Sequence, residues 1–365
     1  MTSWKECTLE SVCSRLSSGK GITAKSISEF GQYPVYGGNG IRGYTNKANF
    51  KGECAIIGRQ GAYCGNVRYF KGDAYMTEHA VVVCANEDNC TRFLAYLLST
   101  MNLGRLSGQS AQPGLSVKTL AKQIIRIPNK EIQLKCAGLL GSLDNKIEQN
   151  EKVNENLLQQ AQAIFANYYA DATNEVPFTS FIQVLGGGTP KTGNPDFWDG
   201  HIPFFTPKDV GNPYVFSTEK SITDAGLEHC NSRLYGINTT FVTARGTVGK
   251  VSLAGIPMAM NQSCYALASD SVDPLLVYFY ALKAVDSLKH KASGAVFDAI
   301  VTRDFNTELV SRISSDDEAV VLDIIRPIMQ SVHSNTMENI HLSQLRDSLL
   351  PRLMSGELDV SDLVL

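Results

Sequence analysis

A heptad stripe that occurs twice constrains the fold of this 365-residue chain more than any other feature of its sequence. Alternating steps of four and three residues between mainly apolar positions are typical of a coiled-coil seam. Every position of the second copy lies 185 residues after its counterpart. The first copy consists of Cys136, Leu140, Leu143, Ile147, Asn150, Asn154, Leu157, Ala161 and Ile164, and the second of Val321, Ile325, Ile328, Val332, Asn335, Asn339, Leu342, Arg346 and Leu349.

Two consecutive Asn residues occupy the middle of each stripe, Asn150 and Asn154 in the first and Asn335 and Asn339 in the second. An Asn in a seam costs stability but selects one register and one partner. Because both copies belong to one chain, we expect an intramolecular, antiparallel helix pair in which the Asn pairs meet at mid-span. Two ordinary amphipathic helices packed in one core are the simpler alternative.

The stripes also predict the extents of the two helices. The first should run from Glu131 to Tyr169, which at about 1.5 Å per residue is roughly 58 Å. Its centre is almost wholly polar outside the seam, so we expect it to be exposed. Pro327 should kink or delay the second helix because proline lacks a backbone donor, and Pro351 should end it.

The segments between the stripes repeat as well. The aligned positions are Leu9, Leu16 and Gly19 with Phe178, Leu185 and Gly188 at an offset of 169, Tyr33–Tyr36 with Ile202–Phe205, and, past an insertion, Arg59–Gly65 with Ala244–Gly249. A duplication of this size controls the fold and implies approximate two-fold symmetry in what is bound. We therefore predict an α+β fold with two globular domains, separated by two long antiparallel coiled-coil helices and related by an internal pseudo-two-fold repeat. The predicted boundaries are 1–128 for the first domain, 129–175 for the first helix, 176–314 for the second domain, and 315–365 for the second helix and tail.

Composition places the chain among cytoplasmic proteins. It has neither an apolar run long enough to span a membrane nor the start of a signal peptide. Its nine Cys form no C-x-x-C pair, which favours reduced thiols over disulfides or zinc ligands. Residues 1–126 carry 15 Lys and Arg against 8 Asp and Glu, whereas residues 313–365 carry 3 against 9. This asymmetry suggests a polyanion on the first domain and protein partners on the acidic helices, although scattered solvated charge is the alternative.

No motif predicts catalysis or a resident cofactor. The G-x-G-x-x-G stretch from Gly38 to Gly43 is not followed by a helical pattern, so a tight turn with glycines at positive φ is the better interpretation. The six His have no metal-ligand spacing. We therefore expect no catalytic residue, no metal and no cofactor in this chain.

Binding chemistry remains, carried by basic and amide side chains in glycine-rich loops. Lys and Arg contact phosphates, whereas Arg, Asn and Gln can pair with base edges. For each single residue, a solvated charge or a turn-forming amide is the alternative. The candidates are Lys20, Arg42, Lys47, Arg59, Gln60, Asn66 and Arg68 in the first domain and Lys191, Lys208, Arg245, Lys250, Asn261 and Gln262 in the second; Lys71, Lys289 and Lys291 are further basic residues of these domains.

Several of these stretches resemble the DNA-specificity subunit of type I restriction-modification systems. The opening of the family's target recognition domains is similar to the run from Leu185 to Asp209, which includes Gly-Gly-Gly-Thr-Pro and Phe-Trp-Asp-Gly, and to Tyr33–Gly43. The Arg-Gly-Thr-Val-Gly run at 245–249 and the ending Leu349–Gly356 also look like the family's. The first domain departs from the pattern, with Ser-Ser-Gly-Lys-Gly in place of Gly-Gly-Gly-Thr-Pro and no Trp, which suits two different half-sites.

The resemblance implies a non-catalytic subunit whose two domains each read half of a bipartite, asymmetric site in double-stranded DNA. The coiled-coil helices set the gap between the halves. It also implies as partners two methyltransferase subunits that use S-adenosylmethionine and restriction subunits that use ATP and Mg²⁺. The implied spacer seam includes Leu143, Ile147, Asn150, Asn154 and Leu157 with Ile328, Val332, Asn335, Asn339 and Leu342. The alternatives are an adaptor protein that binds no DNA and a fused enzyme that both reads and modifies DNA.

Overall fold

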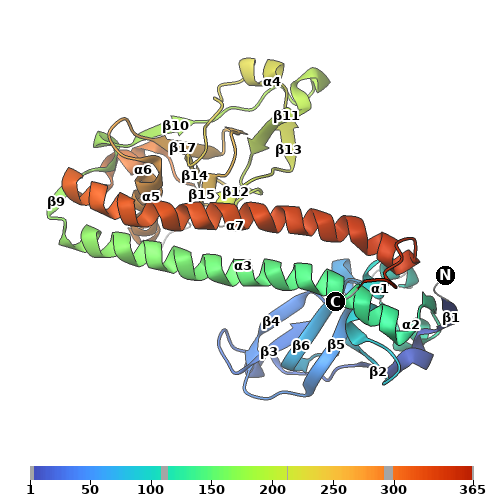
Figure 1. Ribbon diagram of the computed structural model, residues 1–365. Coiled ribbons are helices and arrows are strands. Elements are labelled where there is room, and N and C mark those ends of the chain that lie inside the picture. The colour runs from blue at the N-terminus through green and yellow to red at the C-terminus, as the bar shows by residue number, and fades with distance from the viewer. Residues whose placement is uncertain (1–3, 108–113, 212, 292–298, 364–365) are drawn as a thin grey trace. The chain divides into compact units, whose positions relative to one another are not determined.

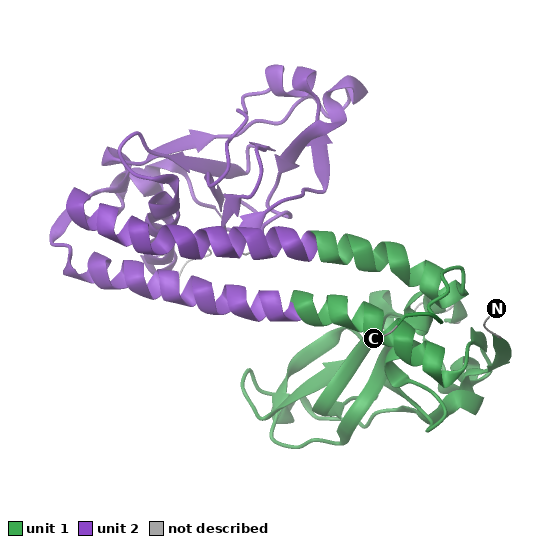
Figure 2. Cartoon of the chain, in the orientation of Figure 1, with its two compact units in different colours: residues 1–147, 341–365 green, residues 148–340 purple. Residues whose placement is uncertain are grey.

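The chain, seen here in a computed structural model, is described over residues 4–107, 114–211, 213–291 and 299–363 (Figure 1). It divides into two compact units (Figure 2). Unit 1 comprises residues 1–147 and 341–365, and unit 2 comprises residues 148–340. Two long helices, α3 (Lys130–Asp171) and α7 (Ser315–Ser355), each contribute residues to both units.

Unit 1 is built on a six-stranded sheet of order β2-β7-β5-β6-β3-β4 and a separate pair, β1 with β8. Alternate residues of β5 enter two different cores, Ala55 and Ile57 one of them and Cys54 and Ile56 the other, so both faces of its central strands are buried. The first of these cores also contains α1, α2 and the start of α3. The elements are β1 (Lys5–Thr8), β2 (Cys13–Ser18), β3 (Tyr33–Gly37), β4 (Gly40–Thr45), β5 (Phe50–Gly58), β6 (Val67–Met76), β7 (Ala80–Ala85), α1 (Thr91–Ser99), α2 (Val117–Ala121) and β8 (Ile124–Ile127).

Unit 2 contains a five-stranded sheet of order β10-β17-β14-β15-β12, a three-stranded sheet of order β13-β11-β16, and the pair β18 with β9. Its largest core joins α5 and the C-terminal part of α3 to the N-terminal part of α7. The elements are β9 (Asn174–Pro177), β10 (Gln183–Gly186), β11 (Trp198–Phe205), β12 (Tyr214–Val215), β13 (Lys220–Ile222), α4 (Asp224–Glu228), β14 (Thr240–Thr243), β15 (Val251–Ala254), β16 (Ala259–Met260), β17 (Cys264–Ala268), α5 (Pro274–Lys291), α6 (Thr302–Thr307) and β18 (Leu309–Arg312).

Strand registers reproduce the duplication inside each unit. Lys5 pairs with Ile127 in unit 1 and Asn174 pairs with Arg312 in unit 2, at the predicted offsets of 169 and 185. The pair β3–β6 is parallel, as is its counterpart β11–β16.

The predicted match of Leu16 with Leu185, and with it that of Gly19 with Gly188, is wrong by one residue. Leu16 pairs with Val83 of β7. The residue of β17 that corresponds to Val83 is Leu267, and it pairs with Val184, so the counterpart of Leu16 is Val184 and not Leu185. A β-bulge between Cys13 and Arg15 adds the extra residue in unit 1, and a bulge leaves no mark in the hydrophobic pattern.

The four Asn residues of the predicted seam meet as expected within unit 2. In unit 2, Asn150 donates to the side-chain oxygen of Asn339 at 2.8 Å, and Asn335 donates to that of Asn154 at 2.9 Å. Moving along α3 from Asn150 to Asn154, the partner in α7 moves back from Asn339 to Asn335. The two helices are therefore antiparallel in this unit, where Figure 2 shows them side by side. Asn150 and Asn335 are equivalent by the 185-residue offset, as are Asn154 and Asn339, so the two hydrogen bonds are related by the pseudo-two-fold axis.

Pro327 does not delay α7, and the expectation that Pro351 ends the helix is wrong. The helix begins at Ser315 and continues through Pro327, because Ser314 caps its N-terminus and Val321 and Ile325 are fully buried in the core of unit 2. The helix also continues through Pro351 to Ser355. Burial of Leu353 and Met354 holds its last turn in unit 1, and Gly356 with a φ of +79° follows the end of the helix. Packing therefore outweighs the cost of a proline, about 3 kcal/mol, at both positions.

Candidate nucleic-acid interface

The most distinctive surface feature is a glycine loop that occurs in both units and is one residue longer in unit 1. After β5, Gly61 and Gly65 adopt φ values of +76° and +87°; after β14, Gly246 and Gly249 adopt +82° and +70°. Left-handed backbone of this kind favours glycine, which explains why the two loops share their glycines.

The residue before the first glycine is held in the same way in both units. Gln60 forms an isolated β-bridge with Gly114, and Arg245 forms one with Ala299, at a common offset of 185. One residue earlier, the carbonyls of residues 59 and 244 accept from the amides of residues 115 and 300 at 2.8 and 2.9 Å. The Gln60 and Arg245 side chains are both exposed. Equivalent backbone positions thus present an amide in unit 1 and a guanidinium in unit 2.

Three predicted arginines of unit 1 gather around the turn between β3 and β4. Arg68 approaches the Asn39 carbonyl with its Nη2 at 3.5 Å, and Arg59 is held by its amide to the His79 carbonyl at 3.0 Å. Arg42 lies over Gly37, where a Cβ would come within 2.6 Å of its Cδ. Gly40 and Gly43 have φ values of +107° and +140°, which confirms the tight turn predicted for the G-x-G-x-x-G stretch and leaves no helix there to hold a dinucleotide.

The remaining candidates of unit 1 are more scattered. The Lys20 amide donates to the Met76 carbonyl at 2.9 Å, which places Lys20 beside the end of β6. Asn66 and Arg68 line one hollow of 470 Å³. Lys47 is exposed between β4 and β5, and in the described residues no hydrogen bond or ion pair joins it to the arginine group.

In unit 2, the loop that carries Lys191 lies against the Asn261–Gln262 turn. The Gly188 amide donates to the Met260 carbonyl at 3.2 Å, and the Thr189 hydroxyl donates to Oε1 of Gln262. Asn261 uses its own Oδ1 to accept from the Ser263 amide at 3.0 Å. This turn therefore brings two predicted amides close to the loop of one predicted lysine, and the side-chain oxygens of both amides are already engaged locally.

Carboxylate partners separate the lysines into two groups. Lys208 pairs with Glu219 at 3.3 Å, Lys71 with Glu53 at 2.7 Å and Lys291 with Glu308 at 2.6 Å. Lys250 and Lys289 have no ion pair among the residues that the structure describes. They line one pocket with Lys208, so the structure assembles basic residues that are far apart in the sequence. Gln162 of α3 also lines that pocket, and no sequence pattern pointed to it.

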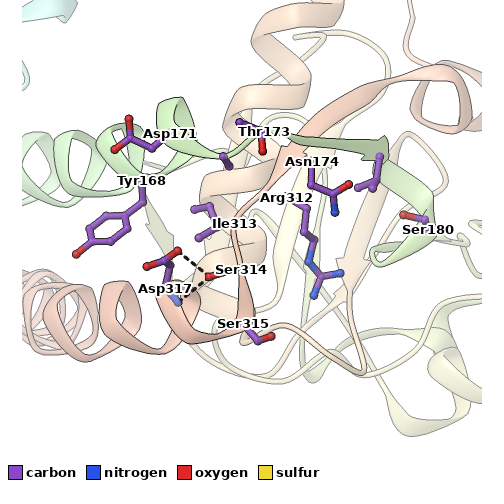
Figure 3. Close-up of a pocket in the computed structure, with 12 residues that line it drawn as sticks. Tyr168, Asp171, Thr173, Asn174, Ser180, Arg312, Ile313, Ser314, Ser315 and Asp317 are labelled. Atoms are coloured by element: carbon purple, nitrogen blue, oxygen red, sulfur yellow. Dashed lines mark hydrogen bonds between the residues drawn. The ribbon is translucent and has the colours of Figure 1, made fainter.

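A second hollow in unit 2, of 630 Å³, lies where α3 leads into β9 and β18 leads into α7 (Figure 3). Ser314 donates to Asp317 at 2.7 Å and caps α7. Arg312 is engaged by the Phe181 ring at 4.2 Å and by Glu318 at 3.4 Å. These side chains thus terminate and anchor helices, and they form no acid-base or nucleophilic pair.

The described residues contain no group of three or more His, Cys, Asp or Glu side chains arranged to hold a metal ion. All nine cysteines are free thiols. Burial raises the pKa of Cys13, Cys54 and Cys264 to about 12, so these thiols stay protonated and unreactive near neutral pH. Over the same residues, no helix combines the length and apolar character needed to cross a membrane.

The family model described as the type I restriction modification DNA specificity domain matches residues 1–159 and again residues 173–307. The chain belongs to this family. The two matches together cover most of the chain, and each begins within a few residues of the start of one half of the duplication. Family membership agrees with the resemblance seen in the sequence motifs.

Individual relatives carry the same description. The chain is 41% identical over 134 residues to the Type I restriction enzyme EcoprrI specificity subunit of Escherichia coli, a match that covers 36% of this chain and 33% of that one. It is 22% identical over 331 residues to the HindI specificity subunit of Haemophilus influenzae, covering 67% and 71% of the two chains. The crystal structure of the type I system S subunit from M. genitalium shares the fold, with a TM-score of 0.67, 15% identity and 96% of both chains covered.

Proposed function

We propose that this chain is the non-catalytic specificity subunit of a type I restriction-modification system and reads a bipartite, asymmetric target in double-stranded DNA. Each unit reads one half-site. The observation that carries the proposal is the glycine loop found in both units, in which the same β-bridge holds Gln60 in one unit and Arg245 in the other, with both side chains exposed. Gln pairs bidentately with adenine and Arg with guanine in the major groove, so one scaffold can read two different bases.

The basic residues around these loops supply the affinity. Arg42 and Arg68 flank the β3–β4 turn of unit 1, and both are exposed. Arginine and lysine contacts to phosphates orient a protein on the duplex without selecting a sequence. In this division of roles, the loop side chains choose bases and the surrounding arginines hold the backbone.

The helix pair sets the distance between the half-sites. Half-sites read from one face of a duplex lie about 34–36 Å apart, or a multiple of that distance. A helix of 42 residues extends roughly 63 Å, which is enough to span such a gap. The hydrogen-bonded Asn pairs support a single register, and therefore a single gap length.

The partners are two methyltransferase subunits, which bind S-adenosylmethionine and methylate adenine, and restriction subunits, which consume ATP with Mg²⁺. The assembly works in the cytoplasm. The net charge of −3 is low for a protein that binds DNA alone, so partner subunits share the phosphate contacts. The salt dependence of DNA binding, measured with and without the methyltransferase, tests this sharing; equal slopes would contradict it.

Methylome sequencing of a host that expresses the system tests the main proposal, because it returns the modified motif directly. The expected result is one bipartite motif with two different halves. Mobility shifts of a random duplex library by the assembled complex provide the biochemical counterpart. A lack of sequence preference in both assays would favour the adaptor protein, and S-adenosylmethionine binding by this chain alone would favour the fused enzyme.

A further inference from the structure

A pocket of 710 Å³ in unit 2 gathers three lysines from three separate elements. Lys208 follows β11, Lys250 precedes β15, and Lys289 lies in the last turns of α5. Gln162 of α3, Thr247, Tyr278 and Asp286 of α5 are the other polar residues that line it in the described part of the chain. The volume is within the range of sites that hold small ligands or parts of larger ones.

The charges of this pocket are incompletely balanced inside the molecule. Lys208 has a carboxylate partner, Glu219, at 3.3 Å. In the described part of the chain, neither Lys250 nor Lys289 has one within ion-pair distance. Asp286 lies 3.7 Å from His290 and attracts Lys289 only from beyond that distance. Burial and the neighbouring Lys250 lower the pKa of Lys289 from its ordinary value. Two unpaired ammonium groups held close together repel each other, and an anion between them would remove that cost.

The loop that carries Lys250 lies directly against the Lys289 side chain. Gly249 has a φ of +70°, and a Cβ there would lie 2.4 Å from Cε of Lys289, so only glycine lets the Lys289 side chain cross the loop. The Gly249 amide donates to the Thr243 carbonyl at 2.8 Å, and the Lys250 amide donates to Oγ1 of Thr243 at 3.0 Å. Thr247 donates from its hydroxyl to the Pro207 carbonyl at 3.1 Å, which ties this loop to the segment that carries Lys208.

The corresponding place in unit 1 lacks this charge. Gly65, the counterpart of Gly249, faces the backbone of Leu103 and Gly104 and not a lysine side chain. Asn66 stands where unit 2 has Lys250, and among the residues that the structure describes, Arg68 is the one basic residue that lines the hollow. The shared fold therefore does not require three lysines here, and their presence in unit 2 calls for a separate explanation.

We propose that this pocket binds a phosphate group, held between Lys250 and Lys289 with Lys208 at its edge. On the proposed function, the phosphate belongs to the DNA backbone beside the half-site read by unit 2. Lysine suits this role because its ammonium is a compact point charge, and phosphate contacts fix orientation without reading sequence. The pocket thus gives unit 2 a backbone contact that unit 1 makes differently or not at all.

The test uses the full chain assembled with its methyltransferase partners. Lys289→Met and Lys250→Met remove one charge each and keep most of the side-chain volume. Lys283→Met is the matched control, since Lys283 lies on the same helix but outside the pocket, over the Tyr169 ring. Lys289→Arg keeps the charge. Affinity for target and unrelated duplexes is measured from 50 to 200 mM salt.

We expect each pocket variant to reduce the slope of log affinity against log salt by about 0.9, the value for one lost phosphate contact. As salt rises from 50 to 200 mM, the ratio of wild-type to variant affinity should therefore fall about 3.5-fold. The loss should be equal for both duplexes, the arginine variant should restore the slope, and the control should leave it unchanged.

A second arm uses inorganic phosphate, titrated into the full chain without DNA and followed by ³¹P NMR. Saturable binding that Lys289→Met abolishes supports the phosphate site and, with unchanged DNA slopes, assigns it to a free phosphate. Unchanged salt slopes of DNA binding together with no phosphate binding overturn the proposal. Unchanged slopes with weakened assembly of the partner subunits also overturn it, because that result would mark a protein contact. If the wild-type complex itself shows no sequence preference, it is the proposed function that fails, and the phosphate titration still judges the pocket.

Discussion

The hydrogen-bonded amides of the seam allow one stability prediction to be worked out in detail. Asn150 is 4% exposed, and its Nδ2 donates to Oδ1 of Asn339 at 2.8 Å and to Oε2 of Glu338 at 2.7 Å. Replacing Asn150 with Ala removes both donors at once. The Asn339 oxygen then faces the seam without that donor, whereas the exposed Glu338 carboxylate can turn to water.

An acceptor deprived of its buried partner costs about 1–3 kcal/mol. Alanine has a higher helix propensity than asparagine, by up to about 0.7 kcal/mol, and this gain offsets part of the loss. The net expectation for Asn150→Ala is a destabilisation of about 1–2 kcal/mol. In the double variant with Asn339→Ala, no partner is left unpaired, so the double variant should lose about 1 kcal/mol less than the sum of the two single variants.

Urea denaturation followed by the helical circular dichroism signal measures these differences. Asn156→Ala is the matched control, because Asn156 is on the exposed side of the same helix and reports the propensity gain alone. Replacing all four seam Asn with Leu should instead raise thermal stability and loosen register, since apolar replacement of both partners removes the desolvation cost. Additive single variants, or an Asn150→Ala no less stable than the control, would refute the hydrogen-bonded seam.

Three further predictions concern spacing, base choice and thiol reactivity. Deleting residues 143–149 and 340–346 together removes one heptad, roughly 10 Å, from each helix. This deletion should shorten the unspecific gap between the half-sites by roughly three base pairs without changing the bases read. Altered bases in the methylome would contradict the spacer role. Arg245→Gln, which copies Gln60 of unit 1, should weaken binding to the native target by about 1–3 kcal/mol and change one base of one half-site, whereas a uniform loss across all sequences in a duplex library would assign Arg245 to a phosphate. Cys264, whose pKa burial raises to about 12, should not react with a thiol reagent at pH 8 until urea unfolds the chain, and rapid modification of the native protein would show that the site opens.

The seam could be predicted from the sequence because a four-three pattern depends only on neighbouring turns of one helix. The predictions that Pro327 delays the helix and that Pro351 ends it failed for the opposite reason. Pro327 and Pro351 obey a local rule, but the burial of Val321 and Leu353, residues contacted by distant parts of the chain, decides whether the helix continues. The one-residue error at Leu16 has a similar origin, since a bulge is defined by the partner strand.

The candidate interface was predictable in composition but not in arrangement. The exposure of Arg42 and Arg68 could be predicted because both lie near glycine-rich turns. Whether a lysine is free depends on carboxylates far away in the sequence, as for Lys71, which pairs across strands with Glu53. The pocket that joins Lys250 to Lys289 exists only because α5 packs against the β14–β15 loop. Pairing and pocket formation are tertiary properties, so a single sequence could list the basic residues without sorting them.

The seam amides also explain how two helices can act as a fixed spacer. In the observed register, residues that face each other across the seam have numbers that add up to 489, as for Asn150 with Asn339 and Asn154 with Asn335. A slip of one heptad would keep the apolar stripe in contact but would place Asn150 opposite Val332 and Asn154 opposite Ile328. Each amide would then lose its partner, at about 1–3 kcal/mol apiece, whereas apolar seam residues barely distinguish the two registers. A seam of leucines alone would tolerate the slip, so a constant distance between half-sites depends on these polar pairs and not on helix length alone.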